Sequence, residues 1–122
     1  MPIIDVRPVV SGSGAWPEGI AQVLADAIAQ VLSAGVARVW VRLAEIREDA
    51  YAENGTTVAG DQLPVFLEVL HAEWPDEQTR TVEAAALAQA VSLCLGRPVD
   101  RIHIEYAPPG RGRVAFGGRL QR

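Results

Sequence analysis

Apolar residues along the chain alternate between strand-like and helix-like patterns. Short runs that are rich in β-branched residues, or that alternate apolar and polar positions, predict strands at 3–10, 37–46, 63–73 and 101–108. Apolar positions three and four residues apart predict helices over 16–35 and 74–96. The order is therefore β-α-β twice, and the tail at 113–120 predicts one more short strand.

The two β-α-β halves also echo each other in their residues. Trp-Pro-Glu before the first helix returns as Trp-Pro-Asp before the second, and the strand RVWVRL returns as RIHIEY, although a chance repeat stays possible. Crossovers between parallel strands are right-handed, so two such units can form one four-stranded sheet with both helices on one face. We expect a single α+β domain over 1–122, with pseudo-repeats at about 2–60 and 64–122.

One face of this predicted sheet has no helix to cover it. Its side chains are a mixture of aromatic and charged residues, namely Trp40, Arg42, Phe66, Glu68, His103 and Glu105. A half-apolar face that bears aromatic rings does not stay bare in water. We therefore expect other subunits to cover it.

Three residues carry local structural signals. Pro8 interrupts the first predicted strand, which points to the edge of a sheet or the end of a strand. Trp16 and Trp74 each precede a helix, and we interpret both as hydrophobic entries to those helices.

Composition and charge narrow the function classes. A chain of 122 residues is long enough for one small core, which oligomerisation would help to cover. The net charge of −4 argues against nucleic acid or an anionic membrane as partner, and no signal peptide or membrane span is recognised. Cys94, the one cysteine, is expected to be a core thiol, which fits a reducing, cytoplasmic location. The histidines form no ligand cluster, so we expect no metal site.

The start of the chain, Met1-Pro2 followed directly by an apolar strand, allows two interpretations. Pro2 is either a strand-edge proline without chemistry or a reactive secondary amine once Met1 has been removed. An acylated proline nitrogen has no basicity, so the second interpretation depends on that removal.

Several stretches together resemble the tautomerase superfamily, which includes 4-oxalocrotonate tautomerase and macrophage migration inhibitory factor. They are the Met-Pro start, the duplicated β-α-β plan, PVFLEVLHAEWPDEQ with Pro64 at a unit's opening proline, VDRIHIEY, and the tail RVAFGGRL. The resemblance spans nearly the whole chain. It implies a homotrimer whose three sheets surround a central channel, and a cofactor-free reaction in which the mature N-terminal proline is the general base.

The resemblance also suggests catalytic residues besides Pro2. His103 and Glu105 fall where the cytokine-like members carry a tyrosine and an asparagine in the pocket, so we propose them as polarising or proton-transferring groups. The alternative is a polar stripe that faces solvent or the channel.

Arginines on the same face are candidates for binding a carboxylate of the substrate. We name Arg42 and Arg38 from the second strand, Arg113 from the tail, and Trp40 as an aromatic contact. The alternative for Arg42 and Arg38 is a salt bridge with Glu45, Glu105 or an acid of a neighbouring subunit.

Two positions depart from the family pattern. Trp74 stands where short-chain members carry a substrate-binding arginine, and Ala37 stands where cytokine-like members carry a lysine. These departures argue against a dicarboxylate substrate. The sequence therefore leaves two hypotheses: a tautomerase or isomerase acting on a small keto-enol acid, or a catalytically silent trimer that serves as a binding or scaffold protein.

Overall fold

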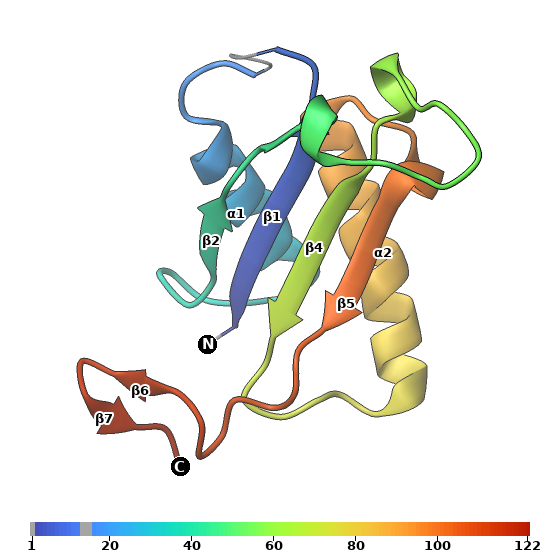
Figure 1. Cartoon of the computed structure of the whole chain (residues 1–122). Coiled ribbons are helices and arrows are strands. Elements are labelled where there is room, and N and C mark those ends of the chain that lie inside the picture. The colour runs from blue at the N-terminus through green and yellow to red at the C-terminus, as the bar shows by residue number, and fades with distance from the viewer. Residues whose placement is uncertain (1, 13–15) are drawn as a thin grey trace.

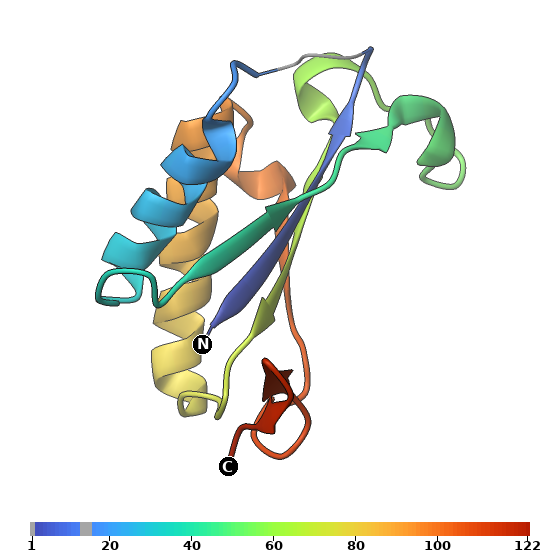
Figure 2. The same cartoon turned by 90° about the vertical axis from the view of Figure 1, so that its left-hand side faces the viewer.

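Two helices lie on one face of a mixed β-sheet (Figures 1 and 2). The computed structural model describes residues 2–12 and 16–122. In chain order its elements are β1 (Ile3–Val10), α1 (Ile20–Val31), β2 (Trp40–Leu43), β3 (Ile46–Arg47), β4 (Val65–Leu70), α2 (Glu77–Leu95), β5 (Ile102–Tyr106), β6 (Ala115–Phe116) and β7 (Arg119–Leu120). Three short 3-10 turns, Glu48–Ala50, Gly60–Gln62 and Val99–Arg101, lie in the connections.

The sheet has the strand order β2-β1-β4-β5. β1 and β2 are parallel and joined through α1, β4 and β5 are parallel and joined through α2, and β1 runs antiparallel to β4. The expected α+β fold, with a four-stranded sheet and both helices on one face, is confirmed. β3 adds a fifth short strand, which also pairs with β1.

Pro8 does not lie in an edge strand, and the expectation of a sheet edge is wrong. β1 is an inner strand, and Pro8 is buried opposite Val65 of β4. On the other side of β1, β2 and β3 continue the same pairing register. Val6 pairs with Leu43 of β2, and Val9 pairs with Ile46 of β3. In this ladder the amide hydrogen of residue 8 would bond to residue 44, and proline has none. The missing donor therefore accounts for the gap between β2 and β3.

The tail forms two strands where one was expected. β6 and β7 make an antiparallel hairpin. Gly117 and Gly118 connect them with φ of 58° and 83°, a left-handed conformation at both turn residues that glycine adopts without steric cost.

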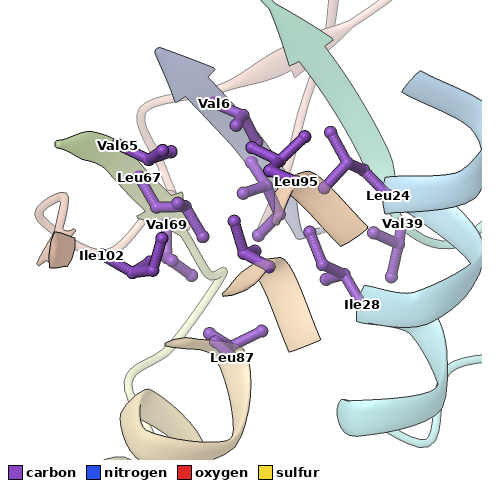
Figure 3. Close-up of a cluster of buried hydrophobic side chains, with 12 residues drawn as sticks. Val6, Leu24, Ile28, Val39, Val65, Leu67, Val69, Leu87, Leu95 and Ile102 are labelled. Atoms are coloured by element: carbon purple, nitrogen blue, oxygen red, sulfur yellow. The ribbon is translucent and has the colours of Figure 1, made fainter. Parts of the chain in front are cut away.

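The hydrophobic core fills the space between the sheet and the helices (Figure 3). Five elements contribute buried side chains of their inward faces: Ile4 and Val6 from β1, Val65, Leu67 and Val69 from β4, Ile102 from β5, Leu24 and Ile28 from α1, and Leu87, Val91 and Leu95 from α2. Cys94 lies at the margin of this core, where burial raises the pKa of its thiol.

The two tryptophans tie the helix entries to distant carbonyls. The Trp16 indole packs against the core and donates to the carbonyl of Leu95 at 2.9 Å, as expected of a hydrophobic helix entry. Trp74 is 44% exposed, and its indole donates to the carbonyl of Ala107 at 2.8 Å. Trp74 therefore lies at the surface, where its hydrogen bond links the segment before α2 to the segment after β5, and it is not a buried hydrophobic entry to the helix.

We expect Leu67→Ala to lower the free energy of unfolding by about 2–5 kcal/mol, because it opens a cavity at the centre of the core. Leu67 is 1% exposed, whereas Leu93 on the outer side of α2 is 76% exposed. Leu93→Ala is the matched control and should change stability by less than about 0.5 kcal/mol. Urea unfolding monitored by circular dichroism measures both, and equal effects would contradict the assigned core.

Candidate functional site

Pro2 lies at the start of the inner strand β1. Its side chain is buried, and its carbonyl accepts a hydrogen bond from the Trp40 amide at 3.2 Å. Met1, on whose removal the chemistry of Pro2 depends, lies outside the described residues.

An aromatic pair flanks this end of β1 on the β2 side. The ring of Trp40 meets that of Phe116 edge to face at 5.3 Å, and the Trp40 indole donates to the carbonyl of Ala37. Phe116 belongs to the C-terminal hairpin, which lies close to the N-terminus in both views (Figures 1 and 2). Trp40 is 51% exposed and also lines an open groove of about 670 Å³ between α1 and β2. An aromatic surface is therefore available near Pro2.

On the β4 side, the neighbour of Pro2 follows from the strand register. Ile3 pairs with Leu70, so the same register places Pro2 opposite His71 at the next position. His71 Nε2 lies 2.8 Å from a carboxylate oxygen of Glu83 on α2, and the same oxygen accepts the Tyr106 hydroxyl at 2.7 Å. The sequence alone does not reveal this cluster, because His71, Glu83 and Tyr106 are far apart in the chain. The only local signal was a histidine placed directly after an apolar strand.

The rings and charges around this cluster are closely packed. His71 and Tyr106 stack with centroids 6.0 Å apart, and the Arg80 guanidinium lies over the rings of Trp74 and Tyr106. Burial, together with the hydrogen bond to Glu83, raises the pKa of the Tyr106 phenol far above its ordinary value. Tyr106 is therefore a constant hydrogen-bond donor to Glu83 at neutral pH.

A row of charged side chains crosses the outer face of the sheet. In register across the strands stand Arg42, Asp5, Glu68 and Glu105. The Arg42 guanidinium donates to both oxygens of Asp5, at 2.6 and 3.0 Å. Arg42 thus has a carboxylate partner, but that partner is Asp5 and not the Glu45 or Glu105 expected from the sequence.

His103 lies at the far end of the same face. Its ring centroid lies 5.5 Å from that of Phe66 in a tilted arrangement, and the Phe66 ring in turn contacts that of Tyr51 at 5.8 Å. In the sheet, His103 pairs with Phe66 of β4, and Phe66 pairs with Arg7 of β1. His103 therefore lies two strands away from β1, level with a residue five positions beyond Pro2. Strand spacing then separates His103 from Pro2 of the same chain by about 19 Å. A similar count puts Glu105 about 14 Å from Pro2.

The remaining candidate arginines lie at the Pro2 end of the molecule. Arg113 is exposed, and its guanidinium donates to the carbonyls of Pro109 and Pro108 at 3.0 and 2.9 Å. Arg38 is exposed in the turn before β2, and within the described residues no side-chain hydrogen bond or ion pair holds it. A single chain therefore brings Trp40 next to Pro2 but leaves His103 and Glu105 elsewhere.

Neither a metal-binding cluster nor a membrane-spanning helix occurs in residues 2–12 and 16–122. Within these ranges no group of three or more His, Cys, Asp or Glu side chains could hold a metal ion. No helix in the same part of the chain has the length and apolar character needed to cross a membrane.

Comparison with known proteins relates the fold to solved structures. No protein-family model and no curated protein matches the sequence. Pt0534 inactivated by 2-oxo-3-pentynoate matches with a TM-score of 0.77 and 18% identity, over 98% of this chain and 94% of its own. A wild-type fused 4-OT that forms a symmetric trimer also reaches 0.77, with 20% identity over 98% and 94%.

Macrophage migration inhibitory factor from Trichinella spiralis has a TM-score of 0.74 and 15% identity, over 97% of this chain and 98% of its own. The resemblance to the tautomerase superfamily is thus confirmed at the level of the fold. At such identities the likeness shows the fold alone.

Glu53 anchors the connection beside His103 and makes a pH-dependent contribution to stability. One of its oxygens accepts the Tyr51 hydroxyl at 2.6 Å and the Arg101 guanidinium at 2.5 Å, and these contacts hold the pKa of the carboxyl below its ordinary value. Because the pKa is lowered on folding, the contribution is present above about pH 4.3 and is lost as the pH falls through the folded-state value.

We expect Glu53→Gln to unfold at lower urea concentration than the wild type at pH 7, and the difference to shrink below about pH 4. Urea titrations at a series of pH values measure this difference. Glu45→Gln, at an exposed residue between β2 and β3, is the control. A difference that grows on acidification would contradict the assigned contacts.

Proposed function

We propose that the protein is a cofactor-independent tautomerase or isomerase of a small keto-enol acid, with Pro2 as the general base after removal of Met1. The observation that supports this most is the place of Pro2. It is buried at the start of an inner strand, beside the Trp40–Phe116 pair, in a fold shared with Pt0534, which 2-oxo-3-pentynoate inactivates.

The chemistry follows from the environment of the amine. A secondary amine is normally protonated at pH 7, and burial away from water disfavours the cation and brings its pKa towards neutrality. Such a base can take a proton from the carbon next to a carbonyl group and return it to another position of the substrate. The proline ring restricts φ and so holds the nitrogen in place.

We also propose a homotrimer in which the outer sheet faces meet, as the fused 4-OT is a symmetric trimer. The outer face carries Phe66 and His103 together with the charged row, and both α1 and α2 lie on the opposite side of the sheet (Figure 2). Because His103 and Glu105 lie far from Pro2 within one chain, we propose that they act on the Pro2 of a neighbouring chain in the trimer.

Substrate binding is proposed for Trp40, Arg38 and Arg113, with Arg42 acting only if it leaves Asp5. We propose a small monocarboxylate with an aryl or alkyl group as substrate, because Trp74 and Ala37 replace the arginine and lysine of the family pattern. The single cysteine fits a reducing compartment, which we propose to be the cytoplasm. Net charge of −4 continues to argue against nucleic acid and anionic membranes as partners.

The second candidate function is a catalytically silent trimer that acts as a binding or scaffold protein. One observation favours it: Arg42 and Arg113 already have partners within the chain, Asp5 for the first and two proline carbonyls for the second. In this alternative the fold is kept and Pro2 has no chemical role.

We expect the protein purified without a tag to begin at Pro2 and to tautomerise an aryl or alkyl pyruvate enol. Pro2→Ala should lower kcat about 100-fold, because it replaces a rigid secondary amine by a flexible primary one. Intact mass, an enol-to-keto absorbance assay and sedimentation of both variants test this. A wild type that starts at Pro2 and shows no rate above buffer supports the silent trimer.

We expect the assembly to sediment as a trimer at micromolar concentration. Phe66→Glu should shift it towards the monomer, because it adds a charge where the proposal buries an aromatic ring. Leu93→Glu, on the outer side of α2, should leave the trimer intact. Sedimentation velocity measures all three, and a monomeric wild type would contradict the proposed assembly.

A further inference from the structure

The cluster of His71, Glu83 and Tyr106 has no role in the function proposed above. The side chains of His71 and Glu83 are only 14% and 12% exposed, and both donors bond to one oxygen of Glu83. The three polar groups come from α2, β5 and the end of β4, and burying them costs free energy unless their interactions offset that cost. Their position next to Pro2 points to the Pro2 amine as the group that they stabilise.

The pairing of β1 with β4 brings His71 close to Pro2. The Val9 amide donates to the Pro64 carbonyl at 2.9 Å, so Val9 and Pro64 form a hydrogen-bonded pair. Pairs alternate along an antiparallel ladder, which makes the Pro2 and His71 positions a narrow pair without mutual hydrogen bonds. The Cα atoms of such pairs are about 4.5 Å apart, and the two side chains lie on the same face. For Pro2 and His71 this is the helix-side face, on which Ile4 and Val69 are fully buried.

The bond to Glu83 determines which nitrogen of His71 can act on Pro2. An ionised carboxylate accepts hydrogen bonds, so Nε2 carries the imidazole proton and Nδ1 of the neutral ring keeps a lone pair. The neutral secondary amine of a mature Pro2 has one N–H and one lone pair. If the N–H donates to Nδ1, the lone pair is directed at the substrate.

We infer that His71, oriented by Glu83 and Tyr106, is a positioning residue for the Pro2 amine. This inference rests on the proposed function. In the reaction the amine takes a proton from the substrate carbon, becomes a secondary ammonium ion and later returns that proton. His71 and Glu83 keep their own protonation states throughout. The negative charge of Glu83 stabilises the ammonium through the imidazole, as a buried acid does behind a catalytic histidine.

Other charged groups also act on this position. Arg80 on α2 lies over the Tyr106 ring, and its positive charge partly offsets that of Glu83. Arg111 and Glu73, in the loops that follow β5 and β4, pair with each other at 2.5 Å and add little net charge. Glu83 also lines a groove of about 430 Å³ between the end of α1 and the start of α2, which gives solvent access to the carboxylate.

Two substitutions of His71 separate positioning of Pro2 from simple support of Glu83. His71→Asn puts an amide oxygen where Nδ1 was and cannot reach Glu83. His71→Gln puts an amide N–H near the place of Nε2 and removes the acceptor next to Pro2. We expect kcat to fall about tenfold in His71→Gln and by less than about threefold in His71→Asn, with KM nearly unchanged in both. Thermal stability should follow the opposite order, because only His71→Gln keeps the bond to Glu83.

Glu83→Gln tests the charge, with Glu53→Gln as its matched control. Glu53 also accepts a tyrosine hydroxyl and a second donor on one oxygen, at the opposite end of the sheet. We expect Glu83→Gln to shift the midpoint of the acidic limb of the kcat/KM profile down by about one pH unit, and Glu53→Gln to leave it in place. An equal midpoint in both variants, or a more active His71→Gln than His71→Asn, would overturn the inference.

A second measurement does not require turnover. The neutral amine should add to the conjugated triple bond of 2-oxo-3-pentynoate, so the mass increases by the whole reagent, at a rate that reports the free-amine fraction. The inference expects the pH midpoint of labelling to move down in His71→Gln and Glu83→Gln. Labelling that shifts in this way without any tautomerase activity refutes the proposed function alone. Normal turnover with unshifted labelling refutes this inference alone, and a retained Met1 refutes both.

Discussion

Hydrogen bonding on both edges of β1 is the constraint on which the structure depends. β1 pairs with β4 along most of its length and with β2 and β3 on the other side. An inner strand cannot slip by one residue without exposing its buried face, so its register is fixed. Because β1 begins at Ile3, the same pairing fixes the position of Pro2 between the Trp40 amide and His71. The site proposed here is therefore held by backbone geometry rather than by a loop.

One-sided coverage of the sheet explains the character of the two faces. The helices bury the inward side chains of β1, β4 and β5. The opposite face keeps aromatic and charged residues together, and Asp5 neutralises Arg42 there while Glu68 and Glu105 stand side by side. Adjacent like charges are unfavourable in a sheet, which makes the acidic end of this row a position where a neighbouring subunit or a cationic group would add stability.

Two carboxylates, one near each end of the sheet, each accept hydrogen bonds from two side chains. Glu53 joins Tyr51 and Arg101 at one end, and Glu83 joins His71 and Tyr106 at the other. Each carboxylate accepts from one tyrosine and one basic side chain, but only Glu83 lies near the start of β1. The same local chemistry can thus serve for support in one place and, by the inference above, for positioning a reactive amine in another.

Sequence periodicity by itself determined the six main elements, their β-α-β order and the outward faces of β2, β4 and β5, because these depend on contacts between neighbours in the chain. It also indicated the aromatic and charged composition of the outer face. The inner position of β1, the gap opposite Pro8 and the partner of Arg42 were decided only by tertiary structure. They depend on which strand edges meet, and Asp5 and Arg42 stand 37 positions apart. The meeting of His71, Glu83 and Tyr106 beside Pro2 has the same origin, since side-chain hydrogen bonds between distant residues leave no period in a sequence.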